Sequence, residues 1–112
     1  MERVQGYQRD QAITIASGAA ASSAINLRGY AQAGYLIPSA FSGATVTFQV
    51  SAENTTYQVL HDSTNTAITQ TVTASKAYAL PISCFAFGYV KLISAAGGGE
   101  GADRTIIVSL KY

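Results

Sequence analysis

Between residues 13 and 110 the sequence is a succession of short segments in which apolar and polar residues alternate. The segments are built from Val, Ile, Thr and Tyr, and Gly, Ser, Asn and Pro separate them. Alternation with a period of two turns one face of a strand toward a core and the other toward water or a partner. The clearest example is 45–51, where two valines and a phenylalanine share one face. The pattern predicts an all-β fold, a single antiparallel β-sandwich of about eight strands with a jelly-roll-like arrangement.

The same pattern sets the expected organisation of the chain. A length of 112 residues fits one domain. We divide it into an extended N-terminal arm, residues 1–11, and a β-sandwich domain, residues 12–112. The arm is polar and lacks periodicity, so we expect a neighbouring molecule to hold it by strand addition. We expect no long helix, and draw the strands from the segments 12–16, 23–27, 33–37, 44–51, 56–60, 67–73, 77–80, 87–94 and 105–111.

The composition favours an assembly over a free enzyme. The chain is 48% hydrophobic and 12% charged, whereas soluble monomers carry about 25% charged residues. A sparsely charged exterior favours self-association or docking. The net charge is +1 and the basic residues are spread singly, so nucleic acid is not an expected partner. The N-terminus lacks the apolar region of a signal peptide, and no run approaches the roughly 18 apolar residues of a membrane span, so export and membrane insertion are disfavoured.

Two motifs suggest chemistry at first sight. The glycine-rich segment 97–101 lacks the Lys-Ser/Thr and the following helix of a phosphate loop, so we interpret it as a flexible hairpin tip. We expect such a tip to become ordered on contact with a neighbouring subunit. His61 and Asp62 are adjacent on a strand and therefore point to opposite faces, and no serine occupies a nucleophile elbow.

Metal-ligand spacing is also missing from the sequence. Cys84 stands alone, which excludes an internal disulfide or a cysteine-based zinc cage, and favours a small buried apolar residue. The sequence leaves open whether folding brings a pair of acids together from Asp10, Glu53, Asp62, Glu100 and Asp103. We expect neither an enzyme nor a cofactor or metal site.

Three roles are open for the seven tyrosines. We place core-edge packing first, protein contact second and stacking on sugars third. With the arm and the glycine-rich tip, this reasoning gives a set of expected protein-contact residues: Arg3, Val4, Tyr7, Arg9, Tyr57 and Glu100.

Several blocks follow one another in order along nearly the whole chain from residue 13. They are 13–18 (ITIASG), 36–43 (LIPSAFSG), 47–51 (TFQVS) continuing to 57–60 (YQVL), 89–94 (YVKLIS) and 104–108 (RTIIV). Each block occurs in many sandwiches, and the signal is their shared order. In this order the chain resembles a family of small β-sandwich virion proteins of tailed bacteriophages, of the capsid decoration or cement type. It departs from that pattern at 53–55, where an Asp-Gly turn is common, and the arm lies outside the resemblance.

The resemblance implies a protein that binds the major capsid protein on the outer surface of the virion and stabilises the shell. It implies a homo-oligomer, with a trimer favoured, made in the cytoplasm of the bacterial host. A rigid sandwich with few charges and a docking arm suits many modest contacts repeated by symmetry. Two alternatives stay open: a receptor- or carbohydrate-binding module of a head or tail fibre, and a tail or connector adaptor component.

Overall fold

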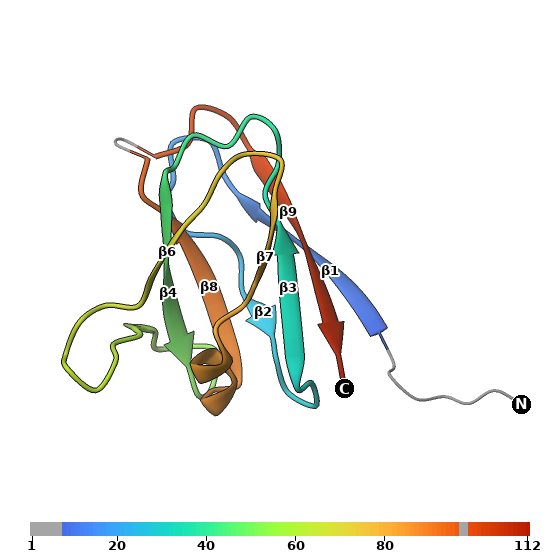
Figure 1. The fold of residues 1–112 in the computed structure, drawn as a ribbon, viewed down its shortest axis with the longest axis vertical. Helices are drawn as coiled ribbons and strands as arrows, with labels where there is room; N and C mark the ends of the chain where they lie inside the picture. Colours follow the sequence, from blue (N-terminus) through green and yellow to red (C-terminus); the bar gives the residue numbers. More distant parts are fainter. Residues whose placement is uncertain (1–7, 97–98) are drawn as a thin grey trace, which may run out of the picture.

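Figure 1 shows the computed structural model, in which residues 8–96 and 99–112 are described. These residues form nine strands and one short 3-10 helix. The bounds are β1 (Gln8–Ile15), β2 (Ile25–Asn26), β3 (Gln32–Leu36), β4 (Thr45–Ser51), β5 (Gln58–Val59), β6 (Thr69–Thr71), β7 (Ala77–Ala79), η1 (Ile82–Ala86), β8 (Tyr89–Ser94) and β9 (Arg104–Lys111). The all-β prediction is confirmed: about eight strands were expected, and the nine observed strands each overlap one of the nine expected segments. The alternation pattern did not indicate the 3-10 helix.

The strands form two antiparallel sheets. Sheet A has the order β1-β9-β3-β7, and sheet B has the order β2-β8-β4-β5, with β6 also paired to β4. Every connection except those from β4 to β5 and from β5 to β6 crosses from one sheet to the other. Strands that pair are therefore mostly far apart in the sequence, and the loops between them gather at the two ends of the molecule (Figure 1).

On the side of β4 away from β8, two short strands, β5 and β6, pair with β4 in place of one continuous strand. Gln49 of β4 faces Val59, whereas Thr47, only two residues away, faces Thr69. Two residues along β4 therefore correspond to ten residues along its partner. The eight extra residues between β5 and β6 leave the ladder. They form the yellow-green loop that projects at the lower left of Figure 1.

A single hydrophobic core lies between the sheets. The residues of each long strand alternate between this core and the outer face, as the sequence predicted. Cys84 on η1 is also fully buried, which confirms its interpretation as an apolar core residue. The largest fully buried side chains from the two sheets are Tyr35, Phe48, Ile13, Ile15, Ile25, Leu92, Ile106 and Leu110. Each such aliphatic or phenylalanine side chain contributes roughly 1.5–3 kcal/mol by its burial.

The start of β1 lies inside the segment expected to be an arm. Residues 8–11 pair with 108–111 of β9, so four residues of the expected arm belong to sheet A. The Gln11 side chain also donates to the Asn26 carbonyl at 3.2 Å, which joins β1 to β2 of sheet B. Expected contact residues Arg3, Val4 and Tyr7 lie outside the described residues.

Candidate protein-interaction site

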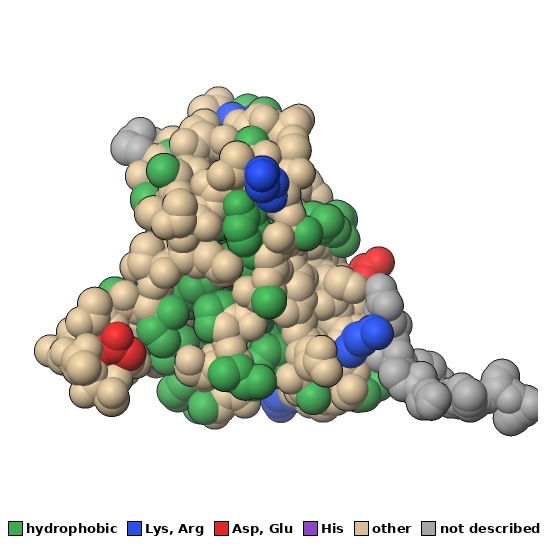
Figure 2. All heavy atoms as spheres, viewed as in Figure 1, with side chains coloured by type: hydrophobic (Ala, Val, Ile, Leu, Met, Phe, Trp, Pro, Cys, Tyr) green, Lys and Arg blue, Asp and Glu red, His purple; other side chains and the backbone are tan. Residues whose placement is uncertain are grey.

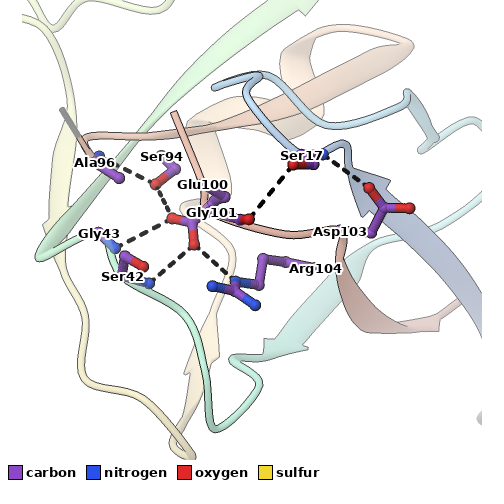
Figure 3. A network of polar contacts seen from close by, with 9 residues as sticks. All are labelled: Ser17, Ser42, Gly43, Ser94, Ala96, Glu100, Gly101, Asp103 and Arg104. Carbon is purple, nitrogen blue, oxygen red and sulfur yellow. Dashed lines mark hydrogen bonds and ion pairs between the residues drawn. The ribbon is translucent and has the colours of Figure 1, made fainter. Parts of the chain in front are cut away.

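Glu100 sits at the centre of a polar network at one end of the molecule (Figure 3). Its Oε1 accepts hydrogen bonds from the Ser42 backbone N–H at 3.0 Å and from Arg104 Nε at 2.9 Å. Its Oε2 accepts from the Gly43 N–H at 3.2 Å and from the Ser94 hydroxyl at 2.6 Å. Because Ser42 and Gly43 precede β4, Ser94 ends β8 and Arg104 begins β9, the network ties the ends of both sheets together.

This carboxylate has no capacity left for a ligand. An ionised carboxylate offers about four acceptor positions, and the four donors described above occupy them. Burial raises the pKa of Glu100, but the hydrogen bonds from Ser94, Arg104, Ser42 and Gly43 together outweigh burial and hold the pKa at about 2. Glu100 is 1% exposed. The expectation that Glu100 contacts a partner is therefore corrected: its side chain is an internal anchor.

Residues 99–101 of the glycine-rich segment differ from the expected hairpin tip, and residues 97 and 98 lie outside the described part of the chain. The segment connects β8 of sheet B to β9 of sheet A, so it does not close a hairpin. Its Glu100 N–H donates to the Ala19 carbonyl at 3.1 Å, and the Gly18 N–H donates to the Glu100 carbonyl at 2.8 Å. Gly99 has φ +86°, and a Cβ there would lie 2.6 Å from the Gly18 backbone. Close approach of two backbones thus explains the glycine at this position.

His61 and Asp62 have separate structural roles. The Asp62 carboxylate accepts from the Thr64 N–H and hydroxyl and from the Thr66 N–H, and closes the turn of the projecting loop. The Thr64 hydroxyl and these backbone bonds lower the pKa of Asp62. Nδ1 of the His61 ring lies 3.0 Å from the Val59 carbonyl oxygen. Within the described residues, no group of three His, Cys, Asp or Glu side chains is placed to hold a metal ion, and no helix is long and apolar enough to span a membrane.

The outer face of sheet A carries a row of apolar side chains. Pairing places Ala12, Ile107, Leu36 and Ala77 side by side across all four strands. Leu36 is 49% exposed and Ile107 is 37% exposed, and both alanines face solvent. We call these four residues the apolar row. Contiguous exposed apolar side chains on a sheet are typical of protein-interaction surfaces.

Next to the apolar row lies a shallow groove of about 580 Å³. Small residues form its floor, because Gly34 and Ala79 pair beside Ser109 in the next row of the sheet. The side chains of Leu36 and Lys111 border it. The apolar row and the groove therefore lie side by side on the outer face of sheet A.

Hydrophobic side chains also gather near η1, at the end of the molecule opposite Glu100. Figure 2 shows them over the lower half of the face in view. Ile82 is 76% exposed, and Phe87 and Val59 are exposed as well. Phe87 and Val59 line a hollow of about 400 Å³ together with the polar residues Glu53 and Gln58.

The outer face of sheet B is more polar and carries two cations over tyrosine rings. Arg28 Cζ lies 5.2 Å from the centroid of the Tyr89 ring, and Lys91 Nζ lies 4.4 Å from the centroid of the Tyr57 ring. Burial raises the pKa of Tyr57, and the nearby Tyr89 adds to that shift. We call these four residues the tyrosine–cation cluster.

Of the residues expected to touch partners, Arg9 lies exposed on β1, and Tyr57 lies in the tyrosine–cation cluster. Their contacts with a partner stay predictions. Sequence reasoning missed Leu36 and Ile107, although Ile107 follows Ile106 in a strand, so one of these two isoleucines had to face outward. The core-edge reading of the tyrosines holds for Tyr35, which is buried, and for two more that pack on the core, Tyr30 and Tyr78.

Comparisons with known proteins bear on the fold. No protein-family profile and no curated protein matches the chain. Among solved structures, the crystal structure of YomS, an SPBc2 prophage-derived protein, is similar with a TM-score of 0.59. The two sequences are 11% identical, and the match covers 99% of this chain and 100% of YomS. This likeness over the full length of both chains shows a shared fold.

Proposed function

We propose that the chain is a bacteriophage virion structural protein, a capsid decoration or cement protein that docks on the outer shell and stabilises it. The observation that carries the proposal is the apolar row beside the groove on sheet A, because exposed apolar side chains of this kind suit the contacts between copies in a symmetric decoration oligomer. The shared fold with a prophage-derived protein supports a phage origin. The major capsid protein is the proposed partner, on the outer surface of the virion after synthesis in the host cytoplasm.

The proposed architecture is a jelly-roll sandwich. In a jelly roll, the chain winds so that the first strand pairs with the last, the second with the next to last, and so inward. The pairs β1 with β9, β2 with β8, β3 with β7, and β4 with the interrupted β5 and β6 follow this scheme. Counting β5 and β6 as one interrupted strand gives the eight strands of a double Greek key.

The proposed role is binding without turnover or cofactor. Four donors occupy Glu100, the acid that the fold buries. A decoration protein needs many contacts of modest strength that symmetry repeats around the shell. The proposed oligomer is a trimer, and the apolar row is its proposed contact between copies.

Self-association has a direct test. The double substitution Leu36→Asp with Ile107→Asp places two charges in the apolar row, and we expect light scattering after gel filtration to show monomers in place of oligomers. The control is Thr69→Asp with Thr71→Asp, which adds the same charges to exposed positions on the outer face of sheet B. A wild-type protein that is monomeric at tens of micromolar, or a row variant that stays oligomeric, contradicts the proposal.

Shell binding has a second test. Cryo-electron microscopy of virions that contain the protein should show density over the shell, whereas density at the portal vertex would indicate a tail or connector component. Deleting residues 1–7 leaves β1 intact, because β1 begins at Gln8. We expect this deletion to lower occupancy on capsids, and unchanged occupancy would contradict a docking role for the arm.

A receptor- or carbohydrate-binding module is the second candidate. The hollow of about 400 Å³ supports it, because exposed Phe87 offers a ring for a sugar and Glu53 and Gln58 offer polar groups beside it. A glycan array distinguishes the two candidates: binding that Phe87→Ala abolishes would favour the module, and no binding would favour the decoration protein.

A further inference from the structure

We propose that the tyrosine–cation cluster on sheet B is a binding site for an acidic, carboxylate-rich protein surface. The inference rests on the proposed function in one respect: we expect the capsid shell to present this acidic surface. Its physical basis is a pair of cations held in place by the fold and not neutralised by a carboxylate of the described residues.

The sheet itself sets the spacing of the cluster. Tyr89 and Lys91 are two residues apart on β8, so both side chains point outward while Val90 between them is buried in the core. Arg28 reaches Tyr89 from the loop between β2 and β3, and Tyr57 reaches Lys91 from the residue before β5. Three separate segments thus bring two rings and two cations onto one face.

Arg28 is held at both ends. Its backbone N–H donates to the Asn26 side-chain oxygen at 3.0 Å, which fixes the start of the turn. Its side-chain stem crosses Gly88, where an added Cβ would lie 3.3 Å from Arg28 Cγ. The missing side chain at Gly88 therefore lets the arginine stem pass close to the backbone on its way to the Tyr89 ring.

Tyr57 is held by the turn after β4. Its hydroxyl donates to the Asn54 side-chain oxygen. Asn54 has φ 66°, a left-handed conformation that asparagine tolerates, and its N–H donates to the Ser51 hydroxyl at 2.9 Å. This turn positions the ring against Lys91.

The two cations have no carboxylate partner within the described part of the chain. The ion pair found there joins Arg104 to Glu100, at the other end of the fold. The acid in the turn near Tyr57 is Glu53, whose Oε1 lies 3.4 Å from the Ser51 hydroxyl. A tyrosine ring attracts a cation without cancelling its charge, so both cations keep their attraction for an incoming anion.

The chemistry favours carboxylates over a nucleic acid. One face of each ring is covered by a cation, which reduces the surface on which bases would stack. Two cations also fall short of the row that a phosphate backbone needs for strong binding. The Arg28 guanidinium matches the two oxygens of a carboxylate, and ordering over Tyr89 reduces the entropy lost on pairing.

The test uses the full chain, a ten-residue glutamate peptide and a ten-nucleotide thymidine strand, at low salt. We expect the peptide to shift the backbone amide NMR signals of Gly88, Tyr89 and Lys91, and 0.3 M salt to weaken the binding. Arg28→Gln with Lys91→Gln should weaken peptide binding by about tenfold. A matched control, Lys76→Gln with Lys111→Gln, removes the same charge at exposed positions and should bind as the wild type does.

Several results would overturn the site. They are no binding of the peptide, equal weakening in the control variant, and tighter binding of the thymidine strand than of the peptide. Thermal unfolding of each variant shows whether the fold is intact, and Tyr89→Leu provides a second variant that keeps both charges but removes the ring under Arg28. Weakened peptide binding in Tyr89→Leu supports the site, and unchanged binding counts against the role of the ring.

Shell occupancy separates this inference from the proposed function. If the peptide binds at the cluster while capsids are not bound, the site stands and the decoration role fails. If capsids are bound equally by the wild type and the Arg28→Gln, Lys91→Gln variant, the decoration role stands and the cluster is not its docking site.

Discussion

The Glu100 network and the tyrosine–cation cluster are two places where this sparsely charged chain concentrates charge, and they use it in opposite ways. The network encloses a carboxylate and supplies every donor from within the fold. The cluster leaves two cations at the surface over aromatic rings. A buried charge must be satisfied internally because its desolvation is costly, whereas water satisfies an exposed one. The network therefore stabilises the fold, whereas the cluster keeps its cations at the surface, as the proposed binding role requires.

The largest expected effect comes from emptying the network. Glu100→Ala leaves Arg104 and the two backbone N–H groups without their acceptor, and we expect a loss of about 3–5 kcal/mol in the free energy of unfolding. Urea denaturation measures it. A loss below about 1 kcal/mol, the range of a surface ion pair, would show that the network is no more important than the cluster.

Lowering the pH should reveal the contribution of Glu100 to the free energy of unfolding without a mutation. The pKa of Glu100 falls from 4.5 to about 2 on folding, so its contribution is complete above pH 4.5 and is lost as the pH falls toward 2. The linkage amounts to about 3 kcal/mol. Urea denaturation across this window measures the slope.

Asp62 titrates in the same direction, because its pKa is also lowered. The control for the acid experiment is therefore Glu100→Gln, which keeps Asp62. We expect the variant to lose most of the slope between pH 4.5 and 2, and an unchanged slope would assign the effect to Asp62 and other acids.

A smaller effect is expected where the network crowds the backbone. A Cβ at Gly43 would lie 2.5 Å from the Ser94 hydroxyl oxygen. Gly43→Ala should displace that hydroxyl from Glu100 and cost about 1–3 kcal/mol, as overpacking does. The matched substitution is Gly18→Ala, where no atom lies within 4 Å but φ is +81°; it measures the backbone strain without the clash. Equal losses in both variants would remove the steric argument.

The smallest effect on stability is expected at the cluster. Arg28→Gln and Lys91→Gln each remove one exposed cation–ring contact, worth about 0.5–1 kcal/mol. Thermal denaturation of the single variants should show changes of this size. A loss comparable to that of Glu100→Ala would mean that the cluster serves the fold, and the contrast between the two regions would disappear.

Sequence alone predicted much of the framework and part of the surface. Each of the nine segments that alternation indicated overlaps one observed strand. Tyr57 was selected as a contact residue, and the structure places it against Lys91. Glu100 was assigned to the surface because it lies among glycines, a context typical of an exposed tip.

The error at Glu100 has a physical cause. Two of the donors, Arg104 and Ser94, are four and six residues away in the sequence, whereas the Ser42 and Gly43 donors are 58 and 57 residues away. Hydrogen-bond donors brought together by folding leave no local pattern. The same holds for the apolar row, whose four members come from four strands and meet only through pairing.

The sequence by itself determined the local geometry of this protein, because a period of two fixes which side chains share a face of a strand. It also determined where the chain turns, since Gly, Asn, Ser and Pro act on the backbone locally. Only the tertiary structure decided which strands are neighbours, which charge is enclosed and which remains at the surface. Those outcomes depend on contacts between distant segments, and their energies arise only when the two sheets close over the core.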